Sequence, residues 1–278
     1  MKRSGNASDK GILHAEAGRR KFTLERFEPS PDQAFFVEWY WHVRWDLRGQ
    51  APYSQEILSY PSVNLVFERE GLRVYTGVYG VPRATYVRRL HGEGEALGIK
   101  FRPGGFYPFW KRPVSLLTGR NIPGGELFGA LAGRTERRMF ALGSAEEMAE
   151  LAESFLREFK PERDAQAELA ARMTEAAASD RSIRKVEELA ERYGLSVRAL
   201  QRLFGRYVGV SPKWVIRRYR LQEAAQLAES GTVPDWARLA SELGYYDQAH
   251  FIKDFKSLLG KTPQEHLKEL QRRKSSQS

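Results

Sequence analysis

Between residues 22 and 101, apolar and polar positions alternate with a period of two in several short runs. In FVEWYWHVRWDL every second residue from Val37 to Leu47 is apolar, and the residues between them are mostly polar. This alternation is typical of a β-strand with one buried face. Shorter runs follow between Gly and Pro residues: SVNLVFE, LRVYTGVYG, ATYVRRL and EALGIKF. Strands at this spacing predict a small β-barrel or sandwich.

After these runs the period changes to that of helices. RPGGFYPFWKRPVSLLTGRNI predicts short helical or irregular structure, with Gly104 and Gly105 in a turn. In SAEEMAELAESFLREF the apolar residues recur every three or four positions, at Met148, Leu151, Ala152, Phe155, Leu156 and Phe159. This stripe predicts a helix over 144–160. Two alternatives are open, because the apolar face either packs on its own β-domain or forms a dimer interface.

The last third of the chain contains one pattern twice. L-A-x-x-x-G occurs at 189–194 and 239–244, and F-x-x-x-x-G-x-S/T-P occurs at 204–212 and 255–263. The second copy has one extra residue between the first Gly and the Phe. In each copy an apolar helical stripe ends at the Gly, which suits a position with positive φ. A second helix then follows, so each copy predicts a helix-turn-helix.

Capping residues support this interpretation. Ser196 and Asp247 are placed to cap the second helix of each copy, and Ser211 and Thr262 are placed to cap a third helix that begins with Pro. One helical hairpin alone is as consistent with an ordinary bundle as with a DNA-binding motif. Two copies with cationic or amide residues on the outer face of the second helix favour DNA binding.

These motifs resemble the C-terminal DNA-binding domain of the AraC/XylS family of bacterial transcription regulators. The resemblance covers residues 182–270 and rests on LSVRALQRLF, GVSP, RLQEAAQLA, LASELGYYDQAHFIKDFK and GKTP. It implies two helix-turn-helix units joined by one rigid helix from Pro212 to about Glu229. Two recognition helices held in this way read two successive major-groove segments, about 34 Å apart. The implied mechanism is binding and not catalysis.

The resemblance also implies which residues contact DNA. The base-reading candidates are Arg198, Gln201, Arg202, Gln248, Ala249, Ile252 and Lys253. The phosphate candidates are Lys213, Arg217, Arg218, Lys256 and Lys261. Arg and Gln side chains bind guanine and adenine edges bidentately, whereas Ala249 and Ile252 offer only apolar contact, for example to a thymine methyl group. The second helix therefore either reads bases or acts mainly as a phosphate clamp.

The charge distribution divides the chain at a similar place. Residues 180–278 carry 19 Lys and Arg against 12 Asp and Glu, so +7 of the net charge of +10 lies there. This excess on the predicted DNA-binding region supports an anionic partner. We expect a disordered tail at 1–20, a β-rich sensing and dimerisation domain at 21–160, a linker with a helix at 161–181 and the DNA-binding domain at 182–272. The fold class is α+β.

The N-terminal domain is expected to sense a ligand. Members of the family often carry a cupin-like β-barrel there, and YWHVRWDL, YPSVNLVFE, GIKFRPGGFYPFW and LTGRNIP resemble one subgroup of such domains. Aromatic residues in the predicted strands form either core or a pocket for an apolar, aromatic or peptidic effector. The candidate pocket residues are Trp39, Trp41, Trp45, Phe67, Tyr75, Tyr79 and Phe101.

Several classes of function are disfavoured. The absence of cysteine excludes disulfides, thiolate catalysis and cysteine zinc sites. His14, His42 and His91 are isolated, so no metal site is expected, and no cofactor or enzymatic motif is expected either. No run approaches the length of a membrane span or a signal-peptide core, which predicts a cytoplasmic location.

The expected partners follow from this interpretation. They are double-stranded DNA, RNA polymerase, a small-molecule or peptide effector and a second copy of the chain. Two rival functions stay open. One is a non-specific architectural DNA binder, and the other is a ligand-binding or enzymatic barrel with a regulatory DNA-binding tail.

Overall fold

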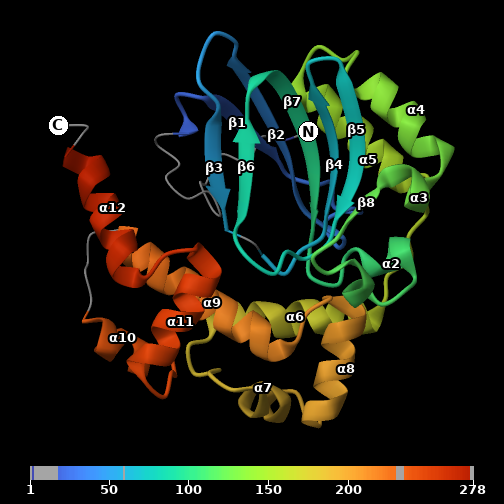
Figure 1. Cartoon of the computed structure of the whole chain (residues 1–278). Coiled ribbons are helices and arrows are strands. Elements are labelled where there is room, and N and C mark those ends of the chain that lie inside the picture. Colours follow the sequence, from blue (N-terminus) through green and yellow to red (C-terminus); the bar gives the residue numbers. More distant parts are fainter. Residues whose placement is uncertain (1, 3–17, 59, 230–234, 276–278) are drawn as a thin grey trace. The chain divides into compact units, whose positions relative to one another are not determined.

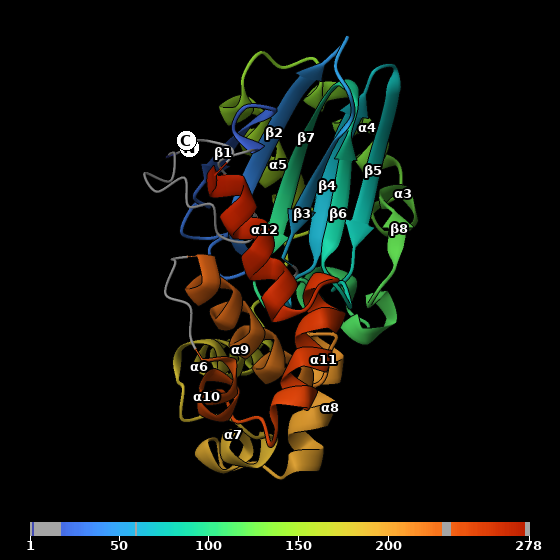
Figure 2. The same ribbon diagram turned by 60° about the vertical axis from the view of Figure 1, so that its left-hand side comes forward.

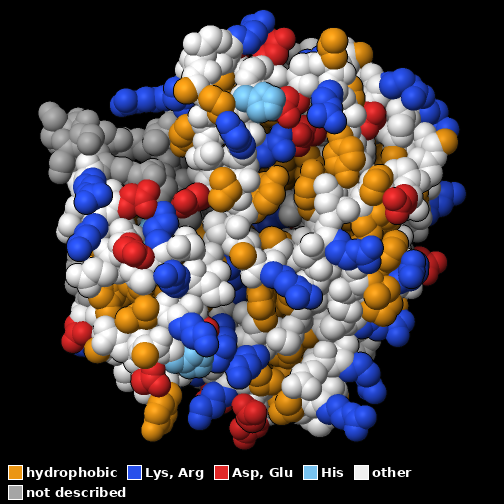
Figure 3. All heavy atoms as spheres, viewed as in Figure 1, with side chains coloured by type: hydrophobic (Ala, Val, Ile, Leu, Met, Phe, Trp, Pro, Cys, Tyr) orange, Lys and Arg blue, Asp and Glu red, His pale blue; other side chains and the backbone are white. Residues whose placement is uncertain are grey.

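A computed structural model describes residues 2, 18–58, 60–229 and 235–275 (Figures 1 and 2). Most of the tail predicted at 1–20 lies outside the described residues, as does His14. The chain forms two compact units, Met1–Ala171 with Leu203–Val210, and Arg172–Arg202 with Ser211–Ser278. All strands but β8 precede the labelled helices along the chain, so strands and helices are largely segregated, which confirms the α+β class. On the face drawn in Figure 3, Lys and Arg outnumber Asp and Glu, in keeping with the net charge of +10.

The strands of the first unit are divided between two antiparallel sheets. The larger has the order β1-β2-β7-β4-β5-β8, and β3 pairs with β6 in the smaller one. The strands are β1 (Phe22–Phe27), β2 (Val37–Leu47), β3 (Tyr53–Ile57), β4 (Asn64–Glu70), β5 (Arg73–Tyr79), β6 (Tyr86–Leu90), β7 (Gly92–Phe101) and β8 (Asn121–Pro123). The expected β-rich domain is thus confirmed.

Strand β2 has buried residues on both faces, and its alternating sequence does not predict this. Trp41 and Trp45 lie on one face, after a bulge near the start of the strand. Tyr40 (0% exposed) and His42 (5% exposed) lie on the other. The Nε2 atom of His42 is 3.5 Å from Oε2 of Glu95. The face that the alternation predicts to be the more polar one is therefore buried at Tyr40 and His42, because helices cover it.

Helices cover one face of the larger sheet. They are α3 (Gly124–Phe128), α4 (Ala130–Met139) and α5 (Ala145–Arg157), and the β3–β6 pair lies on the opposite face (Figures 1 and 2). The side chains of Ser144 and Glu147 form a capping box that starts α5. The ring of Phe155 meets the ring of Phe67 in β4 edge-on, with centroids 5.7 Å apart. The apolar stripe of 144–160 thus packs on its own β-domain, which is the first of the two alternatives.

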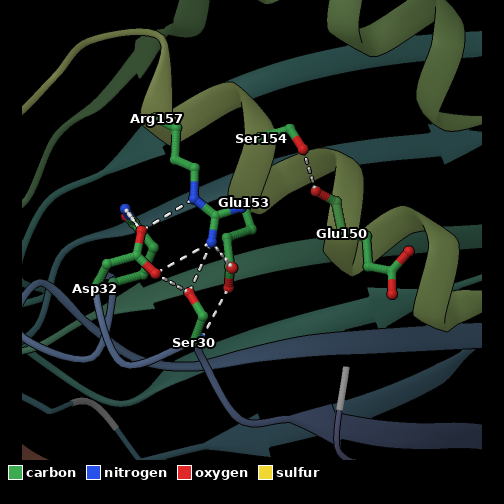
Figure 4. A network of polar contacts seen from close by, with 7 residues as sticks. Ser30, Asp32, Glu150, Glu153, Ser154 and Arg157 are labelled. Atoms are coloured by element: carbon green, nitrogen blue, oxygen red, sulfur yellow. Dashed lines mark hydrogen bonds and ion pairs between the residues drawn. The ribbon is translucent and has the colours of Figure 1, made fainter.

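A polar network ties α5 to the connection between β1 and β2 (Figure 4). Arg157 donates to both carboxylate oxygens of Asp32, at 3.0 and 3.1 Å, and to Oε1 of Glu153 at 2.5 Å. Glu153 is 4% exposed and accepts a hydrogen bond from the backbone N–H of Ser30 at 3.1 Å. Hydrogen bonds from Arg157, then from Ser30 and Gln33, hold the pKa of Asp32 well below its usual range.

The remaining helices are mostly those that the periodicity predicts. They are α2 (Tyr107–Trp110), the 3-10 helix η1 (Val114–Leu117), α6 (Ala165–Ser179), α7 (Val186–Arg192), α8 (Val197–Tyr207), α9 (Pro212–Glu229), α10 (Trp236–Glu242), α11 (Gln248–Leu259) and α12 (Pro263–Ser275). Helix α6 occupies most of the predicted linker at 161–181. Among the residues that the structure describes, no helix has the length and apolar character to cross a bilayer.

Candidate nucleic-acid interface

The first helix-turn-helix consists of α7 and α8. Helix α7 ends at Gly194, which has a φ of +63° that suits glycine. The backbone N–H of Leu195 donates to Ala190 O at 2.9 Å and closes the turn. Oγ of Ser196 accepts a hydrogen bond from the N–H of Ala199 at 3.2 Å. The predicted turn and the predicted N-cap are both confirmed.

The second helix-turn-helix consists of α10 and α11. Gly244 ends α10 with a φ of +83°. A Cβ at this position would also lie 3.0 Å from Cβ of Arg184, so a larger residue would be crowded as well as strained. Tyr245 N–H donates to Ala240 O at 2.9 Å, and Oδ1 of Asp247 accepts from the N–H of His250 at 2.7 Å. The two units therefore share a turn bond and a cap at equivalent places.

The third helices also begin as predicted. Oγ of Ser211 accepts a hydrogen bond from Trp214 N at 3.2 Å, and Oγ1 of Thr262 accepts from Glu265 N at 3.3 Å. The helix after Ser211 is α9, which covers the span predicted for the linking helix.

A buried arginine joins α9 to the end of α6. Arg220 is 2% exposed, and its Nη2 donates to three backbone carbonyls: Ala177 at 3.3 Å, Asp180 at 2.6 Å and Ile183 at 3.1 Å. Burial lowers the pKa of its guanidinium from the ordinary value. We call this contact the arginine clasp. It satisfies carbonyls that a helix end leaves without an intrahelical partner.

A second polar cluster joins α9 to α11. Nη1 of Arg217 lies 3.2 Å from Oδ2 of Asp254, and Nη2 lies 3.1 Å from Nε2 of His250. Asp254 and His250 are not among the predicted site residues. Their spacing of four places them on one side of a helix, which is the signal that points to a shared contact. Arg217 thus helps to position the second recognition helix.

The base-reading candidates lie on the outer faces of α8 and α11. Arg198, Gln201 and Arg202 are exposed in α8, and Gln248, Ala249 and Lys253 are exposed in α11, while Ile252 is half-buried. This placement matches the predicted role, and base reading itself stays a prediction.

The phosphate candidates differ in how accessible they are. Lys213 and Lys256 are exposed. Lys261 is paired with Glu269, with Nζ 2.6 Å from Oε2. Arg218 is 3% exposed and lies over the ring of Trp214, 5.4 Å from its centroid. Because this guanidinium is buried, Arg218 is not accessible to a DNA phosphate.

The candidate effector-pocket residues separate into two groups. The strand register places five of them on the face of the larger sheet that is opposite to α5, namely Trp39, Trp41, Trp45, Tyr75 and Tyr79. Phe67 faces α5, and Phe101 packs against Phe106 at a centroid distance of 5.0 Å. These two residues, both 0% exposed, are core. The structure therefore places five of the seven on one face of the sheet.

Glycines let these aromatic rings lie close against the sheet. A Cβ on Gly98 would come within 2.0 Å of the ring of Trp41, and a Cβ on Gly94 within 2.3 Å of the ring of Trp45. Trp45 is 3% exposed, while the other four residues on this face are half-buried. A separate open groove of about 760 Å³ runs beside β5, α3 and α4 and shares only Tyr75 with the candidate pocket.

In the described part of the chain, no cluster of three or more His, Asp or Glu side chains has the arrangement of a metal site.

Two family models match the chain. One, described as a domain of unknown function, DUF6597, matches residues 25–123. The other, described as a helix-turn-helix domain, matches residues 189–269. The first match falls on the strands of the first unit, and the second runs from α7 into α12.

Individual relatives match over about a third of this chain or at low identity. An uncharacterized HTH-type transcriptional regulator of Haemophilus influenzae is 35% identical over 83 residues, which are 30% of this chain and 28% of the relative. The chain thus spans less than a third of that relative's length.

Solved structures include a probable AraC family transcriptional regulator from Rhodopseudomonas palustris. It is 28% identical and matches over 35% of this chain and 93% of its own, with a TM-score of 0.32. ToxT from Vibrio cholerae is 12% identical over 90% of this chain and 98% of its own, with a TM-score of 0.39. TM-scores this low mean that neither structural similarity supports a conclusion about this chain. The duplicated helix-turn-helix of α7–α12 and the family match over the same residues confirm the resemblance to the DNA-binding region of AraC-type regulators, and the match over residues 25–123 identifies an N-terminal domain of the DUF6597 type.

Proposed function

We propose that the protein is a transcription regulator that binds specific double-stranded DNA through its two helix-turn-helix units. One observation carries the proposal: α7–α8 and α10–α11 repeat the same turn bond and cap, and each second helix exposes cationic or amide side chains. Such helices enter the major groove, where base edges carry a distinct pattern of donors and acceptors.

Binding is divided between positioning and reading. The exposed ammonium groups of Lys213 and Lys256 supply phosphate contacts, which orient the protein without reading sequence. Arg198, Gln201 and Arg202 read base edges, and each good bidentate pair discriminates by about 1–3 kcal/mol. Helix α9, held by the arginine clasp and the Arg217 cluster, keeps the two helices at a set spacing.

We further propose that the first unit makes this binding ligand-responsive. The half-buried Trp39, Trp41, Tyr75 and Tyr79 share one sheet face and offer flat aromatic surface to an apolar or aromatic effector. The same proposal assigns the protein an activating role, with contact to RNA polymerase and assembly as a homodimer. An effector acts only if it binds the DNA-competent state more tightly than the alternative.

Selection from a pool of random duplexes tests the central claim. Full-length protein should enrich one sequence, and the selected duplex should bind at least about 10³-fold more tightly than a shuffled duplex of the same length. Equal affinity for both duplexes would instead establish a non-specific architectural binder. A fluorescence titration with the planar dye 1-anilinonaphthalene-8-sulfonate, on the wild type and on Trp41→Ala, tests the ligand-binding face.

A further inference from the structure

The structure shows where the extra residue of the second helix-turn-helix lies. The turn bonds of Leu195 and Tyr245 are equivalent, since each N–H donates at 2.9 Å to the carbonyl five residues earlier. Ser196 and Asp247 are equivalent as N-caps. Leu195 is followed directly by its cap, whereas Tyr246 stands between Tyr245 and Asp247. Tyr246 is therefore the residue without a counterpart in the first unit.

The two adjacent tyrosines have opposite environments. The ring of Tyr245 meets the ring of Phe251 edge-on, with centroids 5.4 Å apart, and burial raises the pKa of its phenol. Tyr246 is 98% exposed. Packing of the second unit thus uses Tyr245 and leaves the ring and the hydroxyl of Tyr246 in solvent. Tyrosine is enriched at interfaces because its ring is apolar and its hydroxyl can hydrogen-bond, so both groups of Tyr246 are available to a partner.

The position of Tyr246 indicates which partner covers it. It directly precedes the cap of α11, so it stands at the end of the helix whose exposed residues Gln248, Ala249 and Lys253 face outward. In a helix-turn-helix complex the N-terminal residues of the recognition helix reach base edges, and groups around them reach the phosphates that flank the groove. Tyrosine hydroxyls are among the ordinary donors to phosphate oxygens.

The second unit also has few side chains that can donate hydrogen bonds to DNA near the start of α11. Ala249 and Ile252 cannot hydrogen-bond to bases, so α11 has fewer reading groups than α8. The cap of α11 is the carboxylate of Asp247, whose charge repels phosphate, whereas the first unit has the neutral Ser196. A neutral hydroxyl beside the carboxylate adds a phosphate contact at this end of the helix.

We infer that Tyr246 is a DNA contact of the second helix-turn-helix, with its hydroxyl donating to a backbone phosphate at the edge of the major groove. This inference rests on the proposed function. In this inference the second unit mainly binds the DNA backbone, and the inserted Tyr246 makes a phosphate contact that has no counterpart in the first unit.

The test uses the full-length chain, the duplex that the wild type selects from a random pool and a shuffled duplex of equal length. Tyr246→Ala and Tyr246→Phe are measured by fluorescence anisotropy over a range of salt concentrations. Both should weaken binding to both duplexes by about tenfold, the factor expected for one lost hydrogen bond to a charged group. Because the lost donor is neutral, the slope of log affinity against log salt should not change. Lys256→Ala is the matched control, and it should make that slope shallower by about 0.9.

Several outcomes would overturn the inference. Wild-type affinity in Tyr246→Ala shows that the residue does not contact DNA, even if transcription in vitro is impaired. Loss on the selected duplex alone makes Tyr246 a base reader and not a clamp. Wild-type affinity in Tyr246→Phe would show that the hydroxyl does not contact the DNA. An unchanged melting temperature shows that each variant is folded, as expected for a residue that is 98% exposed. If the wild type selects no sequence, the proposed function fails, and that result is distinct from all of these.

Discussion

Replacing Phe155 by Ala should destabilise the first unit strongly and leave the mass of the protein unchanged. Phe155 is 2% exposed, and its ring lies near those of Phe67, Phe128 and Phe159, with centroids 5.7, 5.3 and 5.1 Å away. Truncation therefore removes one ring from an aromatic cluster that connects α5 to β4. The surrounding rings come from β4, from α3 and from the turn after α5, and cannot all move to fill the space.

The magnitude follows from the burial. Phe→Ala at a fully buried site costs about 3–5 kcal/mol, the sum of lost transfer energy and the cavity left behind. That is a large part of the 5–15 kcal/mol that typically stabilises a domain. For a unit of this size the melting temperature should fall by roughly 10 °C. Leu151→Ala is the matched control, because Leu151 lies in the same helix but is only half-buried.

Differential scanning calorimetry of the full chain measures the effect. The transition of the first unit should move, the transition of the second unit should stay, and Leu151→Ala should shift the first by less than half as much. Light scattering on the same samples measures the mass. A variant that melts like the wild type while its mass halves would refute the packing argument. Phe155 would then belong to a dimer interface.

Further predictions concern the DNA-binding unit and the polar network. Arg202→Ala should weaken binding to the selected duplex by about 1–3 kcal/mol and change binding to a shuffled duplex much less, as measured by gel shift. A fragment of residues 172–278 should fold and bind DNA as a monomer, and it should resist urea better than residues 182–278, which lack part of the arginine clasp. Arg157→Ala should raise the pKa of Asp32 toward its ordinary value, as followed by carboxyl NMR. The lowered pKa of Asp32 stabilises the fold above about pH 4, and this stabilisation is lost as the pH falls through the lowered pKa. Arg157→Ala should therefore reduce the free energy of unfolding at neutral pH.

The features that could be predicted from sequence are those that depend on near neighbours in the chain. Gly194 and Gly244 end helices because both positions need a positive φ, and the caps at Ser196 and Asp247 follow from side chains that reach the next turn. These rules use only a few consecutive residues. The turns and helix starts of the DNA-binding region were therefore predictable one residue at a time.

The features that could not be predicted depend on distant segments. Tyr40 and His42 look like the solvent face of β2, but helices far along the chain cover them. Helices α3 and α4 are absent from the predicted elements, because α3 is only five residues long and α4 is mostly polar and contains a Gly. Arg218 looks like a phosphate contact in the sequence and is buried in the fold.

The two helix-turn-helix units have the same turn and cap but expose different side chains, and we expect this difference to determine how each unit contacts DNA. Helix α8 exposes Arg198, Gln201 and Arg202, each able to hydrogen-bond to base edges. Helix α11 has the apolar Ala249 and Ile252 together with exposed lysines. Its Asp254 is paired with Arg217 of α9, and the solvent-exposed Tyr246 stands just before its cap.

Because base contacts specify sequence and phosphate contacts position the protein, the half-site under α8 should show fixed bases in a selected pool. The half-site under α11 should be nearly free in sequence yet still required in length, since deleting it removes phosphate contacts from the complex. We expect α9 to hold the second unit about one helical turn of DNA from the first, so that correct base reading by α8 brings the phosphate contacts of the second unit into place.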